Sequence, residues 1–199
     1  MTRSRLSGAR CLPWAATLTC LVLATTINHA VATPAAAQPT RCTGGRTDSR
    51  GHSSVDGSEI AWEDETRYDD ARQFAATVWS SDGLDRVTFP KDDASRIADM
   101  EWSDVNTTDG TWFNVGAAWS PGPGTDWIRM NSAYLGKGKK FGTRSGRRRV
   151  AAHELGHALG FCHKAASGPA SLMKRLLVEQ PADGRPTRSD RTNYHALWG

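Results

Sequence analysis

The sequence predicts an α+β domain in which one helix is followed by several short strands and then by a second helix. The second helix is indicated by His153 and His157, which stand four residues apart and would share one helical face. Apolar residues at spacings of three and four predict the first helix over about 68–80: Ala71, Phe74, Ala75, Val78 and Trp79. Short apolar runs predict strands at 60–62, 83–89, 98–105, 115–119 and 127–130.

The first 37 residues have the features of a secretory signal peptide. Three arginines precede an apolar stretch at 15–24, and small residues follow, so we expect cleavage after Ala32 or Ala37. The apolar stretch is too short to span a membrane, which predicts a protein released to the extracellular space without membrane contact. Lipid attachment through Cys20 is a weaker alternative, because the apolar run continues beyond it.

Residues 38–58 are mostly Gly, Ser, Thr, Arg and Pro, which predicts a flexible N-terminal arm. Residues 59–199 carry the helix and strand patterns of one folded domain, and we expect a monomer. The whole chain has a net charge of +4. Three of these charges are Arg3, Arg5 and Arg10, and the leader holds no acid, so the remainder is left with +1. That balance argues against nucleic acid as a partner.

The run from His153 to His163 has the order H-E-x-x-H-x-x-G-x-x-H. On a helix, His153 and His157 lie about 5 to 6 Å apart and can each offer a ring nitrogen to one metal ion. Gly160 permits a left-handed turn that ends the helix and returns His163 as the third ligand. Three imidazoles leave a tetrahedral zinc ion one position for water. Chance would match these five positions on the order of once in a hundred thousand such chains, so the motif predicts one catalytic zinc ion.

Glu154 stands beside the first ligand, where a carboxylate can take a proton from the zinc-bound water and pass it to a departing amine. This predicts a secreted zinc endopeptidase that hydrolyses peptide bonds in extracellular proteins. The alternative is a catalytically silent binding module on the same scaffold, in which zinc only stabilises the fold.

Outside the leader the chain holds two cysteines, Cys42 and Cys162. In an oxidising compartment we expect them to form a disulfide, which would contribute about 4 to 5 kcal/mol by closing a long loop. The alternative is that Cys42 stays a free thiolate and caps the zinc until the protein is activated.

The segment 136–149 contains seven cationic residues and no acid. It predicts a basic loop that leads into the second helix, with Ser145 near the N-cap. Two interpretations remain open: the loop is merely solvated, or it attracts acidic or polyanionic partners.

The extended histidine motif resembles that of the metzincin clan of zinc endopeptidases, and Ser171-Leu172-Met173 resembles the methionine turn of that clan. Residues 117–124 resemble the substrate-binding edge strand and following loop of matrixins, and residues 186–199 resemble their C-terminal helix. Residues 167–173 resemble snapalysins, although snapalysins carry Asp at the position of His163. The choice between matrixin-like and snapalysin-like stays open.

The resemblance implies a metzincin-type zincin domain, with a twisted mixed sheet, an active-site helix, a backing helix and a C-terminal helix. It places Met173 beneath the zinc as packing, and residues 174–178 in the wall of a substrate pocket. A peptide or protein substrate would add a strand to the sheet edge. That edge would be formed by Val115, Gly116, Ala117, Ala118 and Trp119. The resemblance also allows a calcium ion, but no acidic loop gives a clear motif for one.

Overall fold

The computed structural model describes residues 38–199. The predicted signal peptide at 1–37 lies outside the described residues. Among the helices of residues 38–199, none combines the length and the apolar character needed to cross a membrane.

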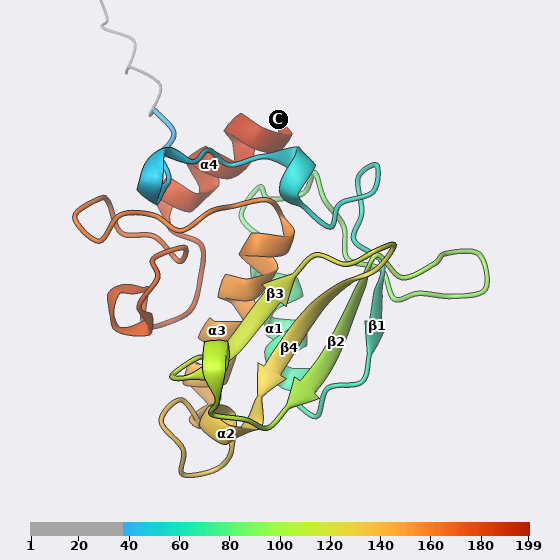
Figure 1. Ribbon diagram of the computed structural model, residues 1–199. Helices are drawn as coiled ribbons and strands as arrows, with labels where there is room; N and C mark the ends of the chain where they lie inside the picture. Colours follow the sequence, from blue (N-terminus) through green and yellow to red (C-terminus); the bar gives the residue numbers. More distant parts are fainter. Residues whose placement is uncertain (1–37) are drawn as a thin grey trace, which may run out of the picture. The chain divides into compact units, whose positions relative to one another are not determined.

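A four-stranded mixed sheet forms the centre of the fold, with the strand order β1-β2-β4-β3 (Figure 1). The strands β1 (Trp62–Asp64), β2 (Met100–Val105) and β4 (Asp126–Asn131) run parallel to one another. The fourth strand, β3 (Ala117–Ser120), pairs antiparallel with β4 and forms one edge of the sheet. The expected α+β class with a mixed sheet is therefore confirmed.

Two helices, α1 (Asp69–Val78) and α3 (Arg144–Ala158), pack against each other behind the sheet as seen in Figure 1. The helix α2 (Ser132–Leu135) is a single turn that follows β4, and α4 (Arg188–Trp198) ends the chain. Thr187 begins α4 with a capping box, in which its side chain and that of Asp190 each accept a backbone N–H of the other residue.

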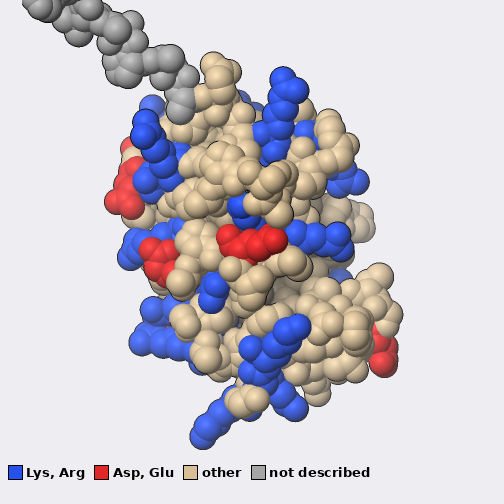
Figure 2. Space-filling model, turned by 90° about the vertical axis from the view of Figure 1, so that its left-hand side faces the viewer, with Lys and Arg blue, Asp and Glu red and all other residues tan. Residues whose placement is uncertain are grey.

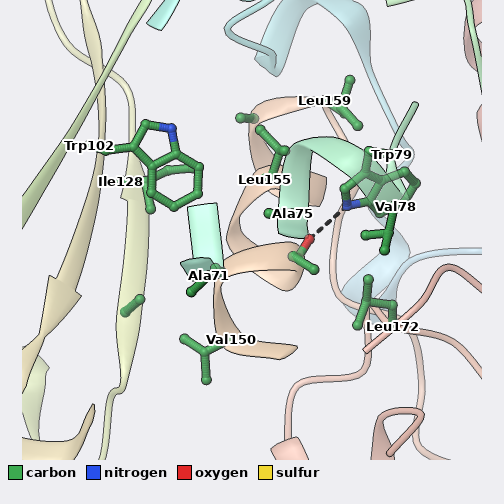
Figure 3. Packing of buried hydrophobic residues seen from close by; sticks show 14 of the residues in the cluster. Ala71, Ala75, Val78, Trp79, Trp102, Ile128, Val150, Leu155, Leu159 and Leu172 are labelled. Atoms are coloured by element: carbon green, nitrogen blue, oxygen red, sulfur yellow. Dashed lines mark hydrogen bonds between the residues drawn. The ribbon is translucent and has the colours of Figure 1, made fainter. Parts of the chain in front are cut away.

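The hydrophobic core fills the space between the sheet and the helices. Trp102 of β2 and Ile128 of β4 face the helices, and Trp79 at the end of α1 is fully buried (Figure 3). The indole Nε1 of Trp79 donates a hydrogen bond of 2.7 Å to the carbonyl of Ala152, drawn as the dashed line in Figure 3. This bond satisfies the one polar group of a buried indole and ties α1 to the helix that carries the histidine motif.

The expected strand at 83–89 is wrong, because this segment forms only an isolated bridge between Glu59 and Thr88. Leu84 and Val87 are buried in the core, so the apolar pattern reflects packing rather than a continuous ladder. The N-cap of α3 is Thr143 rather than Ser145, because the Thr143 hydroxyl accepts a hydrogen bond of 3.0 Å from the backbone N–H of Gly146. The second half of the basic segment is consequently helical.

Candidate metal centre

Three histidine side chains converge at the C-terminal end of α3. The last turns of the helix carry His153 and His157, and the backbone then reverses at Gly160, which has φ of +89°. This reversal brings His163 back, so that its Nε2 lies 3.2 Å from Nε2 of His153 and 3.1 Å from Nε2 of His157. The two helical Nε2 atoms are 3.1 Å apart. The structure thus brings together all three predicted ligands.

A carbonyl oxygen close to each Nδ1 favours the tautomer of the two helical rings that carries its proton there, and Gln180 Nε2 also lies 3.0 Å from Nδ1 of His153. Nδ1 of His153 donates to the carbonyl of Leu172 at 2.8 Å, and Nδ1 of His157 donates to the carbonyl of Phe161 at 2.6 Å. A carbonyl only accepts, so each Nε2 carries a lone pair that points at the other. Lone pairs at such short distances repel unless a cation lies between them, and histidine metal ligands show this same pattern of outer hydrogen bonds.

Burial keeps these rings neutral. It lowers the pKa of His153 to about 4 and lowers the pKa of His157 well below the usual value. The pKa of His163 is also lowered, first by burial and then by the charge of Arg175. A tetrahedral ion bound at about 2.0 to 2.1 Å needs ligand nitrogens roughly 3.3 to 3.4 Å apart, which is close to the spacing found here. The group can therefore hold one metal ion.

Glu154 directly follows His153 on α3 and is buried. Its Oε2 accepts a hydrogen bond of 2.8 Å from the backbone N–H of Trp119, so the carboxylate lies against the edge strand β3. Burial raises the pKa of Glu154 to about 8, while the hydrogen bond from Trp119 lowers it. A dication held by the neighbouring imidazoles would lower that pKa further, because it favours the ionised carboxylate.

Of the predicted substrate-binding residues, three lie in β3: Ala117, Ala118 and Trp119. Val115 and Gly116 precede the strand. The indole Nε1 of Trp119 donates to Ser54 Oγ at 2.9 Å, and Ser54 Oγ donates to Asp126 Oδ2 at 2.7 Å. Residues 38–58 and β4 therefore both fix the edge strand beside Glu154.

Met173, which the resemblance places beneath the zinc, is buried and packs against α3. A Cβ added at Gly156 would lie only 2.4 Å from Met173 Sδ, so the sulfur packs directly against the glycine of the motif helix. The turn before Met173 is held by Asp190 of α4, which accepts hydrogen bonds from Ser171 Oγ at 2.5 Å and from Leu172 N at 2.8 Å. Because Leu172 accepts from His153, Asp190 positions a ligand through one intermediate residue.

Residues 38–58 were expected to form a flexible arm, and the structure places them along the turn that carries His163. Three backbone hydrogen bonds connect the arm to this turn: Thr43 N to His163 O at 2.9 Å, Ser49 N to Gly160 O at 3.0 Å, and Ser54 N to Ala158 O at 2.8 Å. Cys42 and Cys162 form a disulfide with Cα atoms 5.6 Å apart. In this structure Cys42 is thus bonded to Cys162 and does not cap the histidines.

A buried ion pair lies beside the disulfide. Nζ of Lys164 is 2.7 Å from both carboxylate oxygens of Asp48, and the Lys164 side chain is only 1% exposed. Asp48 also accepts hydrogen bonds from Cys162 N at 3.0 Å and from Asn193 Nδ2 at 2.6 Å. The atoms of Cys42, Asp48 and Cys162 lie close enough to suggest a second metal site. The ammonium group among them and the disulfide between the two sulfurs argue against one.

Sequence reasoning missed Asp48, Lys164 and Asp190 as supports of the centre. The pair Thr187 and Asp190, spaced as in a capping box, was the available signal for Asp190. No family model matches the chain, and no curated protein matches it. The functional assignment therefore depends on the geometry of the three histidines and Glu154.

Proposed function

We propose that this chain is a secreted zinc-dependent endopeptidase that hydrolyses peptide bonds in extracellular proteins. One observation carries the proposal: three neutral imidazoles present their Nε2 atoms to one point, 3.1 to 3.2 Å apart, beside a buried carboxylate. The resemblance of the extended motif and the methionine turn to metzincins supports the same assignment.

Zinc suits this donor set better than the other common divalent ions. Zinc favours nitrogen and sulfur ligands in a tetrahedral arrangement, whereas calcium and magnesium favour sets of oxygen ligands. Three protein ligands with one open position are typical of catalytic rather than structural zinc. When bound, the ion supplies a Lewis acid that polarises a peptide carbonyl and lowers the pKa of a water molecule towards 7.

Glu154 would perform the proton transfers. The N–H of Trp119 holds Oε2 of this carboxylate, which leaves Oε1 to accept a proton from the attacking water. The same carboxylate then returns the proton to the departing amine. Placing the carboxylate on α3, one residue from His153, keeps the base and the metal ligands on one rigid element.

The substrate would lie extended along β3, whose outer edge is not paired with any strand of residues 38–199. Main-chain hydrogen bonds to this edge would hold a peptide without demanding a particular sequence. Leu176 and Val178 are exposed apolar residues within 174–178, the segment that the resemblance assigns to a pocket wall. We therefore expect a preference for an apolar side chain after the scissile bond.

Secretion is supported by the leader features and by the disulfide, since disulfides persist in oxidising compartments. We expect the released protein to act as a monomer and to need one zinc ion.

The decisive comparison uses Glu154→Gln, which preserves the shape of the side chain and an oxygen that can accept from Trp119. Zinc-loaded protein is incubated with a fluorescent peptide library. Loss of the base should lower the cleavage rate by about 10² to 10⁴-fold while zinc content stays at one per chain. Glu63→Gln, at an exposed acid on β1, serves as the matched control and should leave the rate unchanged.

A zinc-loaded wild-type chain that cleaves no peptide in the library would refute the endopeptidase assignment. The alternative of a catalytically silent, zinc-stabilised binding module would then take its place.

A further inference from the structure

The seven cations of the basic segment have different environments in the structure. Arg144 and Arg148 each place Nε near Asp70 Oδ2, at 3.2 and 3.4 Å. Arg149 donates from Nη1 to the carbonyl of Leu177 at 2.8 Å, and Lys140 donates from Nζ to Asn114 Oδ1 at 3.2 Å. These four side chains therefore have partners that explain their presence.

The remaining three, Lys137, Lys139 and Arg147, line a surface hollow of about 570 Å³ together with Arg67. The hollow lies where α2 and the loop after it meet the residues that precede α1 and follow β2. Figure 2 shows Lys and Arg side chains projecting from the lower end of the molecule, the end where Figure 1 places α2 and that loop. No Asp or Glu is among the residues that line the hollow. Its other lining residues are Tyr68, Asn106, Thr108, Ser132, Ala133, Leu135 and Gly136.

The charges around the hollow are only partly neutralised by the protein. Within residues 38–199, the three cations of the basic segment form no ion pair, and Arg67 alone is paired, with Nε 2.6 Å from Asp104 Oδ2. The four cations that line the hollow and the one carboxylate paired with them, Asp104, together carry an excess of roughly three positive charges. The N-terminus of α3 lies nearby and adds to this positive potential through the helix dipole.

Arg147 is the fixed member of this group. It is half-buried, donates from Nη1 to the carbonyl of Gly142 at 2.7 Å, and lies with Cζ 5.8 Å from the centre of the Tyr68 ring. Its Nε is buried and has no hydrogen-bond partner within residues 38–199, and the same holds for Nε of Arg72, Arg148 and Arg149. Of these four arginines, Arg147 is the one that lines the hollow. A partly desolvated guanidinium without a counter-charge is unfavourable, and an anion is the ligand that would compensate it.

We propose that this hollow binds a small ligand that carries two or more phosphate groups. The guanidinium of Arg147 and the ammonium groups of Lys137 and Lys139 provide the charge that phosphate oxygens require. Asn106, Thr108 and Ser132 add neutral hydrogen-bonding groups at the wall. The volume lies within the range of small-molecule sites and is too large for a single phosphate ion. The inference is independent of the proposed peptidase activity, because it uses no residue of the metal centre.

Isothermal titration of the full zinc-loaded protein with tripolyphosphate tests this proposal. The site variant is the double substitution Lys137→Gln and Lys139→Gln. The matched control is Lys140→Gln with Arg144→Gln, which removes the same charge from the same segment outside the hollow. We expect saturable one-to-one binding by the wild type, at least a tenfold loss in the site variant, and less than a threefold change in the control. Both substituted pairs are exposed, so folding should be retained, and circular dichroism checks it.

Two further titrations define the ligand and its location. In the first, a sugar bisphosphate replaces tripolyphosphate, which distinguishes phosphate esters from free polyphosphate as the ligand. Binding of either compound supports the site if it is weakened by the substitutions at Lys137 and Lys139. Because polyphosphates also bind zinc, the tripolyphosphate titration is repeated after zinc removal, where the affinity should persist. Equal losses in both double variants, disappearance of binding without zinc, or no saturable binding by the wild type would overturn the proposal.

Discussion

The two halves of the candidate metal centre are held in place by different kinds of structure. His153 and His157 are fixed by four-residue spacing within one helix, and their rings are oriented by nearby carbonyls. His163 stands on an irregular turn that is held by the disulfide, by the Asp48–Lys164 ion pair and by backbone contacts from residues 38–58. The helical half is therefore local in sequence, whereas the turn half depends on residues more than a hundred positions away.

Removing the disulfide should have the largest effect on the turn half. Replacing Cys42 and Cys162 with serine opens a loop whose ends are 120 residues apart, which corresponds to about 4 to 5 kcal/mol in the chain-entropy model. Urea unfolding of the zinc-free protein measures this loss directly. Zinc affinity should fall as well, because His163 becomes mobile while the helical pair keeps its geometry. A loss below about 1 kcal/mol would show that the other contacts hold the turn without the disulfide.

Asp48→Asn should cost about 3 to 5 kcal/mol, because it leaves the ammonium group of Lys164 buried without a counter-charge. The matched rescue is Asp48→Leu combined with Lys164→Met, which removes both charges. If the ion pair is the cause, the double variant should recover most of the unfolding free energy in the same urea assay. A double variant as unstable as Asp48→Asn would instead implicate the hydrogen bonds of Asp48 to Cys162 and Asn193.

Gly160→Ala tests the close approach of the arm to the turn. Gly160 has φ of +89°, and a Cβ there would lie 2.4 Å from the carbonyl oxygen of Ser49. We expect a loss of about 2 to 3 kcal/mol from backbone strain and steric overlap together. Gly138→Ala is the control, since Gly138 has φ of +77° with open space around it and reports the backbone strain alone. Equal losses in the two variants would exclude a contribution from the contact with Ser49.

Replacing Tyr194 of α4 should give the smallest effect, because its hydroxyl stabilises the domain and contacts neither half of the candidate metal centre directly. Its hydroxyl oxygen accepts hydrogen bonds of 2.9 Å from Arg86 N and Val87 N, and burial raises its pKa above the usual value of 10. Because the pKa of Tyr194 is higher in the folded than in the unfolded state, its hydroxyl contributes fully to the free energy of unfolding below pH 10. That contribution is lost as the pH rises further. Tyr194→Phe should cost about 1 to 2 kcal/mol at pH 7 and should weaken the alkaline decline in thermal unfolding. If Tyr194→Phe loses thermal stability at alkaline pH as steeply as the wild type, groups other than Tyr194 cause that loss.

The same contrast explains what the sequence could predict. Apolar spacing located α1, and the histidine motif located α3 and three ligands that the structure brings together, because helical periodicity is a local property. The position of residues 38–58 was not predictable from composition. Their attachment relies on backbone hydrogen bonds, one ion pair and one disulfide rather than on an apolar stripe. The strand predicted at 83–89 was wrong for a different reason. Leu84 and Val87 are buried in the core, so the apolar pattern is that of a strand although the segment does not pair as one.

Zinc K-edge X-ray absorption on the purified, zinc-loaded protein tests the central claim most directly. Coordination by Nε2 of His153, His157 and His163 predicts three nitrogen ligands at about 2.0 to 2.1 Å and one oxygen ligand from water. The alternative group at Cys42, Asp48 and Cys162 would instead place sulfur at about 2.3 Å. One zinc per chain with nitrogen and oxygen ligands alone would agree with this account. Sulfur in the first coordination shell, or no bound zinc, would contradict it.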